Sequence, residues 1–225
     1  IWSRANFNRL SNVIDQHTEA KLFVVELLKT QGNEFYQLSQ IHKARERYLN
    51  GIAIFRYWHP SKRVIVTEES LNYESQGQSN EVKSLISALL RNLAACFKSE
   101  GDLKRTILLL DESIELEPYN DKAWFRRYQA IDAPRHFHSI PEAIDCLELA
   151  IKYAQTKKDE VYFHKHLQDI QMRYVKEMSG RQGLDQIISR EEIIKNSPFF
   201  TDGMRATDLL RSHRSTKLWD NKEMI

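Results

Sequence analysis

Five polar side chains in the sequence have the types and the spacing of an anion-binding set. They are Lys29, Asn33, Asn92, Lys122 and Arg126. Lys29 and Asn33 are four residues apart, so they share one face if their segment is helical. Lys122 and Arg126 have the same spacing, and Asn92 lies between the two pairs. Cations and amides directed at one place would hold a carboxylate through charge-assisted hydrogen bonds, so we expect helices that face a shared surface.

The composition favours a helical globular protein. The 225 residues suffice for one sizeable domain, or for a domain with a tail. The hydrophobic fraction of 41% and the charged fraction of 28% are ordinary, and the 7 Gly and 5 Pro are too few for a turn-rich sheet fold. The net charge of +2 is uninformative about nucleic acid. The short basic stretches near Arg45 and Arg126 predict no nucleic-acid partner, and the absence of an apolar run of about 18–20 residues predicts no membrane partner.

Two segments, 25–56 and 87–118, share one pattern of two amphipathic stretches joined by a polar turn. Gly101-Asp102 marks the turn in the second segment, and Pro118 ends its second helix. Small residues recur where two helices must approach closely, and larger ones recur between them. The small residues are Gly32, Ala44, Gly51, Ala94 and Ser113, and the larger ones are Phe35, Tyr48, Phe97 and Leu110. A third unit follows, with Trp124 and Tyr128 on its first helix, and Ala143, Leu147, Ala150 and Ile151 on its second.

This pattern resembles the tetratricopeptide repeat, a helix–turn–helix of about 34 residues that stacks into a right-handed superhelix. The phrase DESIELEP, at 111–118, is typical of that family. The resemblance implies an all-α fold of three repeats closed by a capping helix, within a domain at 1–178. The repeats are expected at about 21–58, 86–119 and 120–156, and the capping helix at 159–178. A generic antiparallel helical bundle is the alternative fold.

The repeat spacing breaks in two places. An insertion at about 59–83 follows the first unit; its polar centre, 73–80, predicts a loop, and Val64–Val66 predicts a local helix or strand. A smaller insertion around 134–141 lies inside the third unit. The pattern assigns no defined structure or role to the C-terminal tail, 179–225. The apolar side of the capping helix is expected to be Val161, Leu167, Ile170 and Tyr174.

The five polar residues match the carboxylate clamp of tetratricopeptide co-chaperones, which hold the acidic C-termini of heat-shock proteins 90 and 70. The motif KTQGN supplies Lys29 and Asn33, LLRN supplies Asn92, and DKAWFR supplies Lys122 and Arg126. The register fits once the insertion is removed, and such an insertion is also seen in immunophilin-type co-chaperones. The resemblance implies a cytoplasmic peptide-binding module, a co-chaperone or its adaptor domain, without catalytic residues, cofactor or metal.

Two other functions are compatible with such repeats. The chain begins at Ile1 rather than Met, which predicts a fragment of a longer protein. The repeats could then be a regulatory or targeting arm of a peptidyl-prolyl isomerase or a phosphatase, whose catalytic domain would lie outside this segment. They could also form a scaffold that binds an internal peptide. Dependence on a free C-terminal carboxylate separates the clamp from the scaffold.

The remaining chemical groups give weaker signals. The pairs His136/His138 and His164/His166 lack the spacing of known metal motifs, so surface histidines are the preferred interpretation over a metal hydrolase. Cys96 and Cys146 resemble small core residues, which fits a reducing compartment, although an even pair allows a disulfide. Some aromatic residues are interpreted as repeat packing and others as possible apolar walls of the groove. The packing residues are Phe35 and Trp124, and the wall candidates are Tyr36, Phe97 and Phe125.

Overall fold

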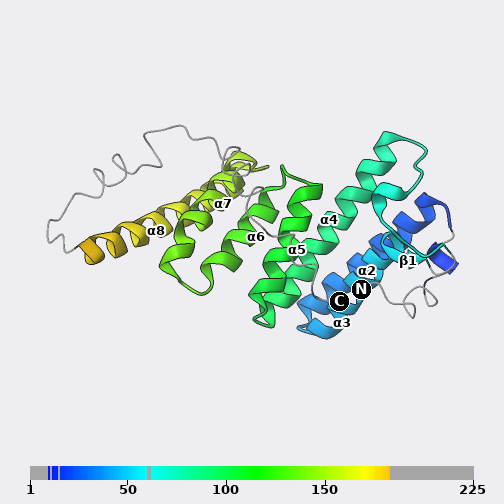
Figure 1. The fold of residues 1–225 in the computed structure, drawn as a ribbon, viewed down its shortest axis with the longest axis horizontal. Helices are drawn as coiled ribbons and strands as arrows, with labels where there is room; N and C mark the ends of the chain where they lie inside the picture. The colour runs from blue at the N-terminus through cyan, green and yellow to red at the C-terminus, as the bar shows by residue number, and fades with distance from the viewer. Residues whose placement is uncertain (1–9, 11, 15, 60–61, 183–225) are drawn as a thin grey trace.

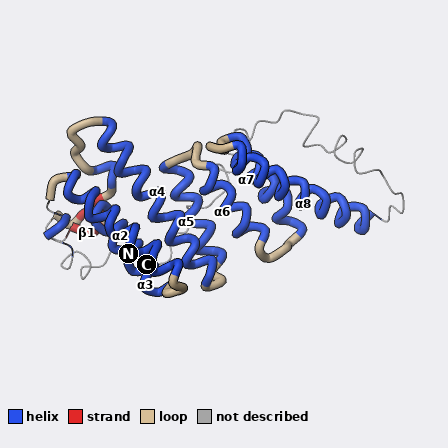
Figure 2. The backbone as a smooth tube through the Cα atoms, turned by 180° about the vertical axis from the view of Figure 1, so that it is seen from behind, coloured by secondary structure: helices blue, strands red, loops and turns tan. Residues whose placement is uncertain are grey.

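The computed structural model describes residues 10, 12–14, 16–59 and 62–182. These residues form a row of packed helices that runs from α2 and α3 at one end to α8 at the other (Figure 1), and Figure 2 shows the same row from behind. The helices are α2 (Thr18–Gln37), α3 (Ile41–Phe55), α4 (Gln76–Ser99), α5 (Leu103–Leu116), α6 (Asp121–Asp132), α7 (Ile140–Lys152) and α8 (Lys157–Gln182). The all-α prediction is confirmed, with one small hairpin as an addition.

The helices stack as consecutive pairs. Each helix packs against the next one along the chain, from α2 through to α8. In addition α2 contacts α4, and α4 contacts α6, so the first helices of the three pairs form one row. This row decides which residues from distant parts of the sequence come together, because a helix face that is continuous across α2, α4 and α6 is shared by three segments.

Short polar turns end and start these helices as the sequence predicts. Gly101 has a φ of +81°, a left-handed conformation that glycine adopts without strain, and it leads into α5. The Asp102 side chain then accepts a hydrogen bond from the Arg105 backbone N–H at 3.0 Å. Asn120 caps α6 in the same way, through the Ala123 N–H. Each cap satisfies a donor that the first helical turn would otherwise leave without a partner.

Two apolar clusters fill the stack, one between α2 and α5 and the other between α5 and α8. The small residues that the sequence singles out lie where helices approach one another. A Cβ on Gly51 would meet Leu89 Cδ1 of α4 at 3.0 Å. A Cβ on Gly32 would lie against the Tyr48 ring of α3, 2.8 Å from Cδ1 and 2.9 Å from Cζ. Glycine at 32 is therefore required for the α2–α3 approach.

Replacing Gly32 by alanine should destabilise the fold by about 1–3 kcal/mol. Overpacking at the rigid Tyr48 ring outweighs the ~1 kcal/mol that alanine gains over glycine in a helix. Gly77 is the matched control, because a Cβ there would meet only Ser75 Oγ, at 3.7 Å. Urea denaturation of both variants measures the difference. A Gly32→Ala midpoint equal to or above that of Gly77→Ala would contradict the expected clash.

The insertion after the first pair leaves the stack intact, because α3 packs directly against α4. It contains an antiparallel hairpin, β1 (Tyr57–His59) with β2 (Val64–Val66), and a 3-10 turn, η1 (Glu68–Ser70). Val64–Val66 is thus a strand. The hairpin lies at the α2–α3 end of the stack (Figure 1).

The loop predicted for 73–80 is wrong in its second half, because α4 already begins at Gln76. Ser75 caps the helix, and its Oγ accepts a hydrogen bond from the Gln78 backbone N–H at 3.2 Å. The first buried apolar side chain of α4 is Val82. The preceding turns are polar because they lie largely in solvent, so they show no apolar periodicity to distinguish a helix from a loop.

A buried ion network anchors the insertion. The Arg56 guanidinium, at the end of α3, contacts the carboxylates of Glu68 in η1 and Glu112 in α5. Tyr73 adds a hydrogen bond from its hydroxyl to the Glu68 backbone oxygen at 2.6 Å. Burial opposes the Arg56 charge, but the hydrogen bonds and charges of both carboxylates outweigh it, so the pKa of Arg56 is raised. The base of the hairpin is therefore fixed to two helices.

The last helix closes the stack by a slightly different face from the predicted one. Phe163, Leu167 and Ile170 are buried in the apolar cluster that α8 shares with α5, α6 and α7, and Tyr174 is half-buried. Val161 was expected among them, but its side chain is 61% exposed. Spacings of four and three residues keep 163, 167 and 170 on one side of a helix, whereas 161 lies two residues away and points elsewhere. The tail beyond 182 lies outside the described residues.

Candidate functional site

The row of first helices carries all five residues of the predicted anion-binding set. Lys29 and Asn33 lie on α2, Asn92 on α4, and Lys122 and Arg126 on α6. We call these five the clamp residues. Because α4 contacts both α2 and α6, the insertion does not separate the first pair from the others.

A chain of hydrogen bonds joins three clamp residues across the three helices. The Asn92 Nδ2 donates to Asn33 Oδ1 at 2.9 Å, which links α4 to α2. The Arg126 guanidinium donates to Asn92 Oδ1 at 3.3 Å and to the Arg91 backbone oxygen at 2.8 Å, which links α6 to α4. Tyr48 of α3 completes the chain, with its hydroxyl donating to Asn33 Oδ1 at 2.8 Å. We call this set of four side chains the polar ladder.

The hydrogen bonds of the ladder all run toward Asn33, and donors of the ladder itself bind its amide oxygens. The Asn33 amide oxygen accepts two hydrogen bonds, and the Asn92 amide oxygen accepts the one from Arg126. An asparagine amide has one acceptor oxygen and two N–H donors, and arginine has donors only. The polar atoms that the ladder leaves over are therefore N–H donors from Asn33, Asn92 and Arg126. Such a surface suits an anion and disfavours a ligand that must donate.

The two clamp lysines are placed differently from the other three residues. Lys29 is half-buried, with its Nζ 2.7 Å from the Glu26 carboxylate one turn earlier on α2. Lys122 is exposed, one turn before Arg126 on α6. Within the described part of the chain, neither lysine side chain forms a hydrogen bond or an ion pair with a ladder residue. Their ammonium groups belong to flexible stems, so a ligand could draw both toward it.

Electrostatics in the ladder also favours an incoming anion. Burial lowers the pKa of Arg126, and the nearby Arg91 charge lowers it further, against the smaller opposing effect of Tyr36 and Tyr48. Burial and the Arg126 charge likewise lower the pKa of Lys98, whose Nζ donates to Gln129 Oε1 at 2.8 Å. A negative charge bound here would relieve the repulsion among these cations.

Lys98 is a neighbour of the site that the sequence did not reveal. It lies on α4, six residues after Asn92, and the clamp pattern contains no such position. Its closeness to Arg126 follows from the packing of α4 on α6. The run KSEGD, which the sequence presents as a polar turn, gave no signal that its lysine would face the same row.

An aromatic cluster borders the cations on the side of α8. The Phe125 ring lies 4.7 Å from that of Phe163, 5.3 Å from that of Tyr162 and 5.2 Å from that of His166, centroid to centroid. Phe125 precedes Arg126 and follows Lys122 by three residues on α6. The cluster thus shares α6 with Lys122 and Arg126, and Tyr162 is its exposed member.

The other aromatic candidates differ in how deeply they are packed. Trp124 is buried and donates its indole N–H to the Pro118 backbone oxygen at 2.8 Å, so the packing interpretation is confirmed. The Phe97 ring contacts the Arg45 and Arg105 guanidinium groups, which lie 5.6 and 5.4 Å from its centroid. Phe35 is half-buried beneath two further cations, and Tyr36 is exposed beside it.

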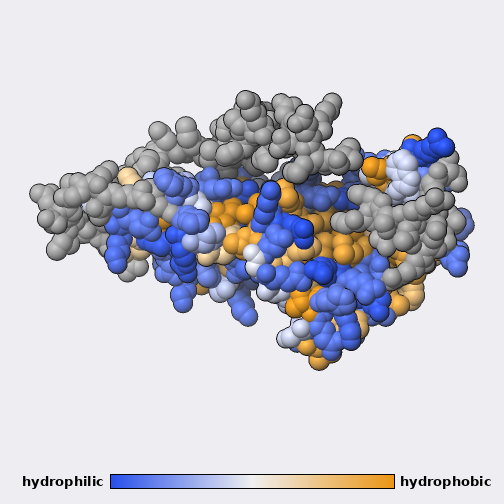
Figure 3. All heavy atoms as spheres, turned by 60° about the horizontal axis from the view of Figure 1, so that its bottom comes forward, coloured by the Kyte–Doolittle hydropathy of each residue, from blue (hydrophilic) through white to orange (hydrophobic). Residues whose placement is uncertain are grey.

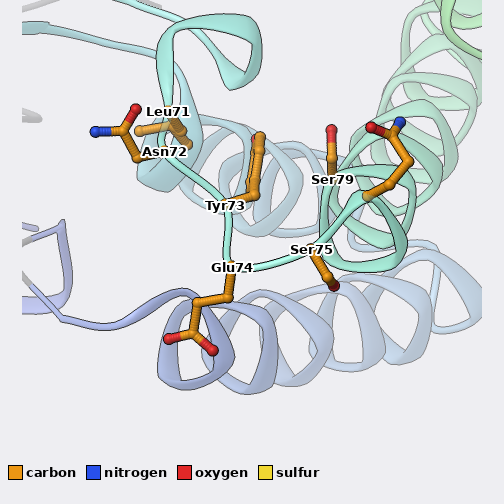
Figure 4. A pocket seen from close by; sticks show the side chains of 7 residues that line it. Leu71, Asn72, Tyr73, Glu74, Ser75 and Ser79 are labelled. Carbon is orange, nitrogen blue, oxygen red and sulfur yellow. The ribbon is translucent and has the colours of Figure 1, made fainter.

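An open hollow elsewhere on the surface is separate from this site. Seven side chains from one continuous stretch line it, where the chain enters α4 (Figure 4). They are Leu71, Asn72, Tyr73, Glu74, Ser75, Gln76 and Ser79. None is a clamp residue, and all seven lie within the insertion predicted at about 59–83, so the hollow belongs to the insertion.

The histidines and cysteines have the placement of ordinary structural residues. His136 and His138 are exposed in the turn before α7, and His164 is exposed on α8, as predicted. The prediction is wrong for His166, which is half-buried in the aromatic cluster. Among the described residues, no three His, Cys, Asp or Glu side chains gather where they could hold a metal ion. Cys96 and Cys146 are free and buried, which confirms their interpretation as core residues, and burial raises the pKa of each thiol to about 11.

Comparison with solved structures decides the fold. The chain is similar to the C-terminal TPR-containing domain of a Plasmodium falciparum protein described as an FK506-binding protein. The two share 19% sequence identity, the match covers 75% of this chain and 99% of that one, and the TM-score is 0.53. The chain has the tetratricopeptide-repeat fold. The three helix pairs α2–α3, α4–α5 and α6–α7 are the stacked units of that fold, and the clamp residues lie on the first helix of each unit.

Comparisons of the sequence with family models and with curated proteins found no match. Within the described residues, no helix of this tetratricopeptide-repeat domain has both the length and the apolar character needed to span a bilayer. On the face seen in Figure 3, apolar residues lie across the middle of the described part of the chain, interrupted by polar ones, and reach its lower edge.

Proposed function

We propose that this chain is a protein-binding module that holds the free C-terminal carboxylate of an acidic peptide with Lys29, Asn33, Asn92, Lys122 and Arg126. The polar ladder is the observation that carries the proposal. It joins Asn33, Asn92 and Arg126 across three helices, and the atoms it leaves over are donors. The two lysines, each one turn from a ladder residue, would add charge without needing to be preorganised.

The chemistry of the site fits a peptide that ends in an acidic residue. Such a terminus carries two carboxylates, one on the main chain and one on the side chain. Hydrogen bonds to charged groups contribute on the order of 1.5–3 kcal/mol each. After the cost of ordering a short peptide, we expect affinity at roughly the micromolar level, about −8 kcal/mol. The aromatic cluster around Phe125 and Tyr162 would meet side chains further from the terminus.

The partner that fits this chemistry best is the C-terminus of heat-shock protein 90 or 70, which ends in Glu-Glu-Val-Asp. The match of all five clamp residues to the co-chaperone pattern supports this identity. The module would then be a co-chaperone, or its adaptor domain, working in the cytoplasm. The similarity to a domain of an FK506-binding protein supports the immunophilin-like branch, in which any isomerase activity belongs to another domain.

Amidation of the peptide terminus should weaken binding at least about fivefold, because it removes one charge and one acceptor pair from the donors of the site. Calorimetric titration with a peptide ending in Glu-Glu-Val-Asp, as the free acid and as the amide, measures this. Lys122→Ala is the matched change on the protein, since an exposed side chain can be removed without disturbing the fold. Equal affinity for acid and amide would instead indicate a scaffold that binds internal peptides.

A further inference from the structure

Tyr48 stands outside the clamp residues, yet it holds one of them in place. We propose that Tyr48 is a positioning residue for ligand binding, because its hydroxyl fixes the orientation of the Asn33 amide so that Asn33 presents N–H donors to the carboxylate. The inference rests on the proposed function, and it adds a specificity-determining group from α3, the second helix of its unit.

The geometry is specific to the Tyr48 hydroxyl. It donates to Asn33 Oδ1 at 2.8 Å, and Asn92 Nδ2 donates to the same oxygen at 2.9 Å. With two donors on its oxygen, the Asn33 amide group has one favoured orientation. Its Nδ2 then points away from the ladder. Rotation by 180° would set Asn33 Nδ2 against Asn92 Nδ2, a donor against a donor, and would make the Tyr48 hydroxyl accept instead of donate. It would also turn an acceptor oxygen toward the ligand, where a carboxylate would be repelled.

The packing explains how a residue of α3 reaches a groove residue of α2. Tyr48 is only 2% exposed, and its ring passes beside Gly32, the residue before Asn33. Any side chain at 32 would occupy the space of that ring. Gly32 therefore opens the path, and the hydroxyl emerges at Asn33.

The protonation state of Tyr48 is constant. Burial is the main cause that raises the pKa of Tyr48 well above its ordinary value. The hydroxyl therefore keeps its proton and remains a donor over the whole pH range in which the fold would be studied. The orientation of Asn33 does not depend on a titration, so binding should show no pH dependence from this pair.

The test is a double-mutant cycle between Tyr48→Phe and Asn33→Ala, read by calorimetry with the free-acid Glu-Glu-Val-Asp peptide. Phenylalanine keeps the buried ring and removes only the hydroxyl. We expect Tyr48→Phe alone to weaken binding about three- to tenfold, the effect of losing one hydrogen bond from an oriented donor. In the Asn33→Ala background it should have no further effect, because the group that it positions is absent.

Tyr73→Phe is the matched control, since the Tyr73 hydroxyl also donates to an oxygen, but in the insertion. It should leave affinity unchanged. Wild-type affinity for Tyr48→Phe would overturn the inference. So would an equal loss of affinity in the Asn33→Ala background, which would indicate a general effect of the α2–α3 packing.

Failure of the proposed function has a different signature. In that case Lys122→Ala and Asn33→Ala would both bind the free-acid peptide like the wild type, whatever Tyr48→Phe does. If instead Lys122→Ala and Asn33→Ala weaken binding and Tyr48→Phe does not, the site is correct and only the role of Tyr48 is wrong.

Discussion

Replacing Arg126 by alanine should weaken binding of a free-acid Glu-Glu-Val-Asp peptide by about 10–100-fold. Arg126 is half-buried, and it donates hydrogen bonds to the Arg91 backbone oxygen and to Asn92 Oδ1. Its truncation would remove a charge-assisted hydrogen bond to the ligand, worth about 1.5–3 kcal/mol, and each 1.4 kcal/mol corresponds to about tenfold in affinity. It would also leave Asn92 free to rotate and present its oxygen. Calorimetry with the same peptide checks the result.

Two other variants make the Arg126 experiment specific. Lys104→Ala removes an exposed lysine from α5, outside the row of first helices, and should bind like the wild type. Arg126→Lys keeps the charge but lacks the planar guanidinium, so its loss of affinity should fall between those of Arg126→Ala and Lys104→Ala. Thermal melting of each variant separates lost binding from lost folding. Affinity of Arg126→Ala equal to that of Lys104→Ala would rule out a role for Arg126 in the site.

The second large effect is on the free energy of unfolding, and it concerns the ion network that anchors the insertion. Arg56→Met should destabilise the fold by about 3–5 kcal/mol, because it leaves the buried Glu68 carboxylate without its charged partner. The Glu112 carboxylate is partly exposed and can return to solvent, whereas Glu68 is 3% exposed and cannot. Urea denaturation measures the loss.

Two further variants test whether the loss of stability comes from the buried Glu68 charge. Adding Glu68→Met to Arg56→Met removes the stranded charge, and part of the stability should return. Arg105→Met disrupts an exposed ion pair with Asp102 on α5, and its cost should stay under about 1 kcal/mol. If Arg56→Met costs no more than Arg105→Met, the ion network does not anchor the insertion.

The sequence by itself predicted most of the helices and their pairing, and it singled out the residues of the candidate site. Amphipathic periodicity, the Gly101-Asp102 turn and the helix end at Pro118 are local signals, because each depends on contacts within a few residues. Small residues such as Gly32 marked close helix approaches, since only a missing side chain leaves room there. The spacing of the clamp residues placed them on the first helix of each unit.

The tertiary structure decided what depends on contacts between distant segments. The polar run before Val82 is helical, and Phe163 rather than Val161 is the buried residue of the first turns of α8. The anchoring of the insertion through Arg56 needs three segments to meet, and neither composition nor periodicity encodes such a meeting.

In the site, too, local sequence and helix packing decided different properties. Its residue types could be read along the chain, but the hydrogen bonds from Tyr48 to Asn33 and from Asn92 to Asn33 join residues of three helices. Those bonds fix which end of each amide faces outward, and the packing of α4 on α6 brings Lys98 beside Arg126. Local sequence sets which groups are available, and only the packing of helices sets their distance and direction.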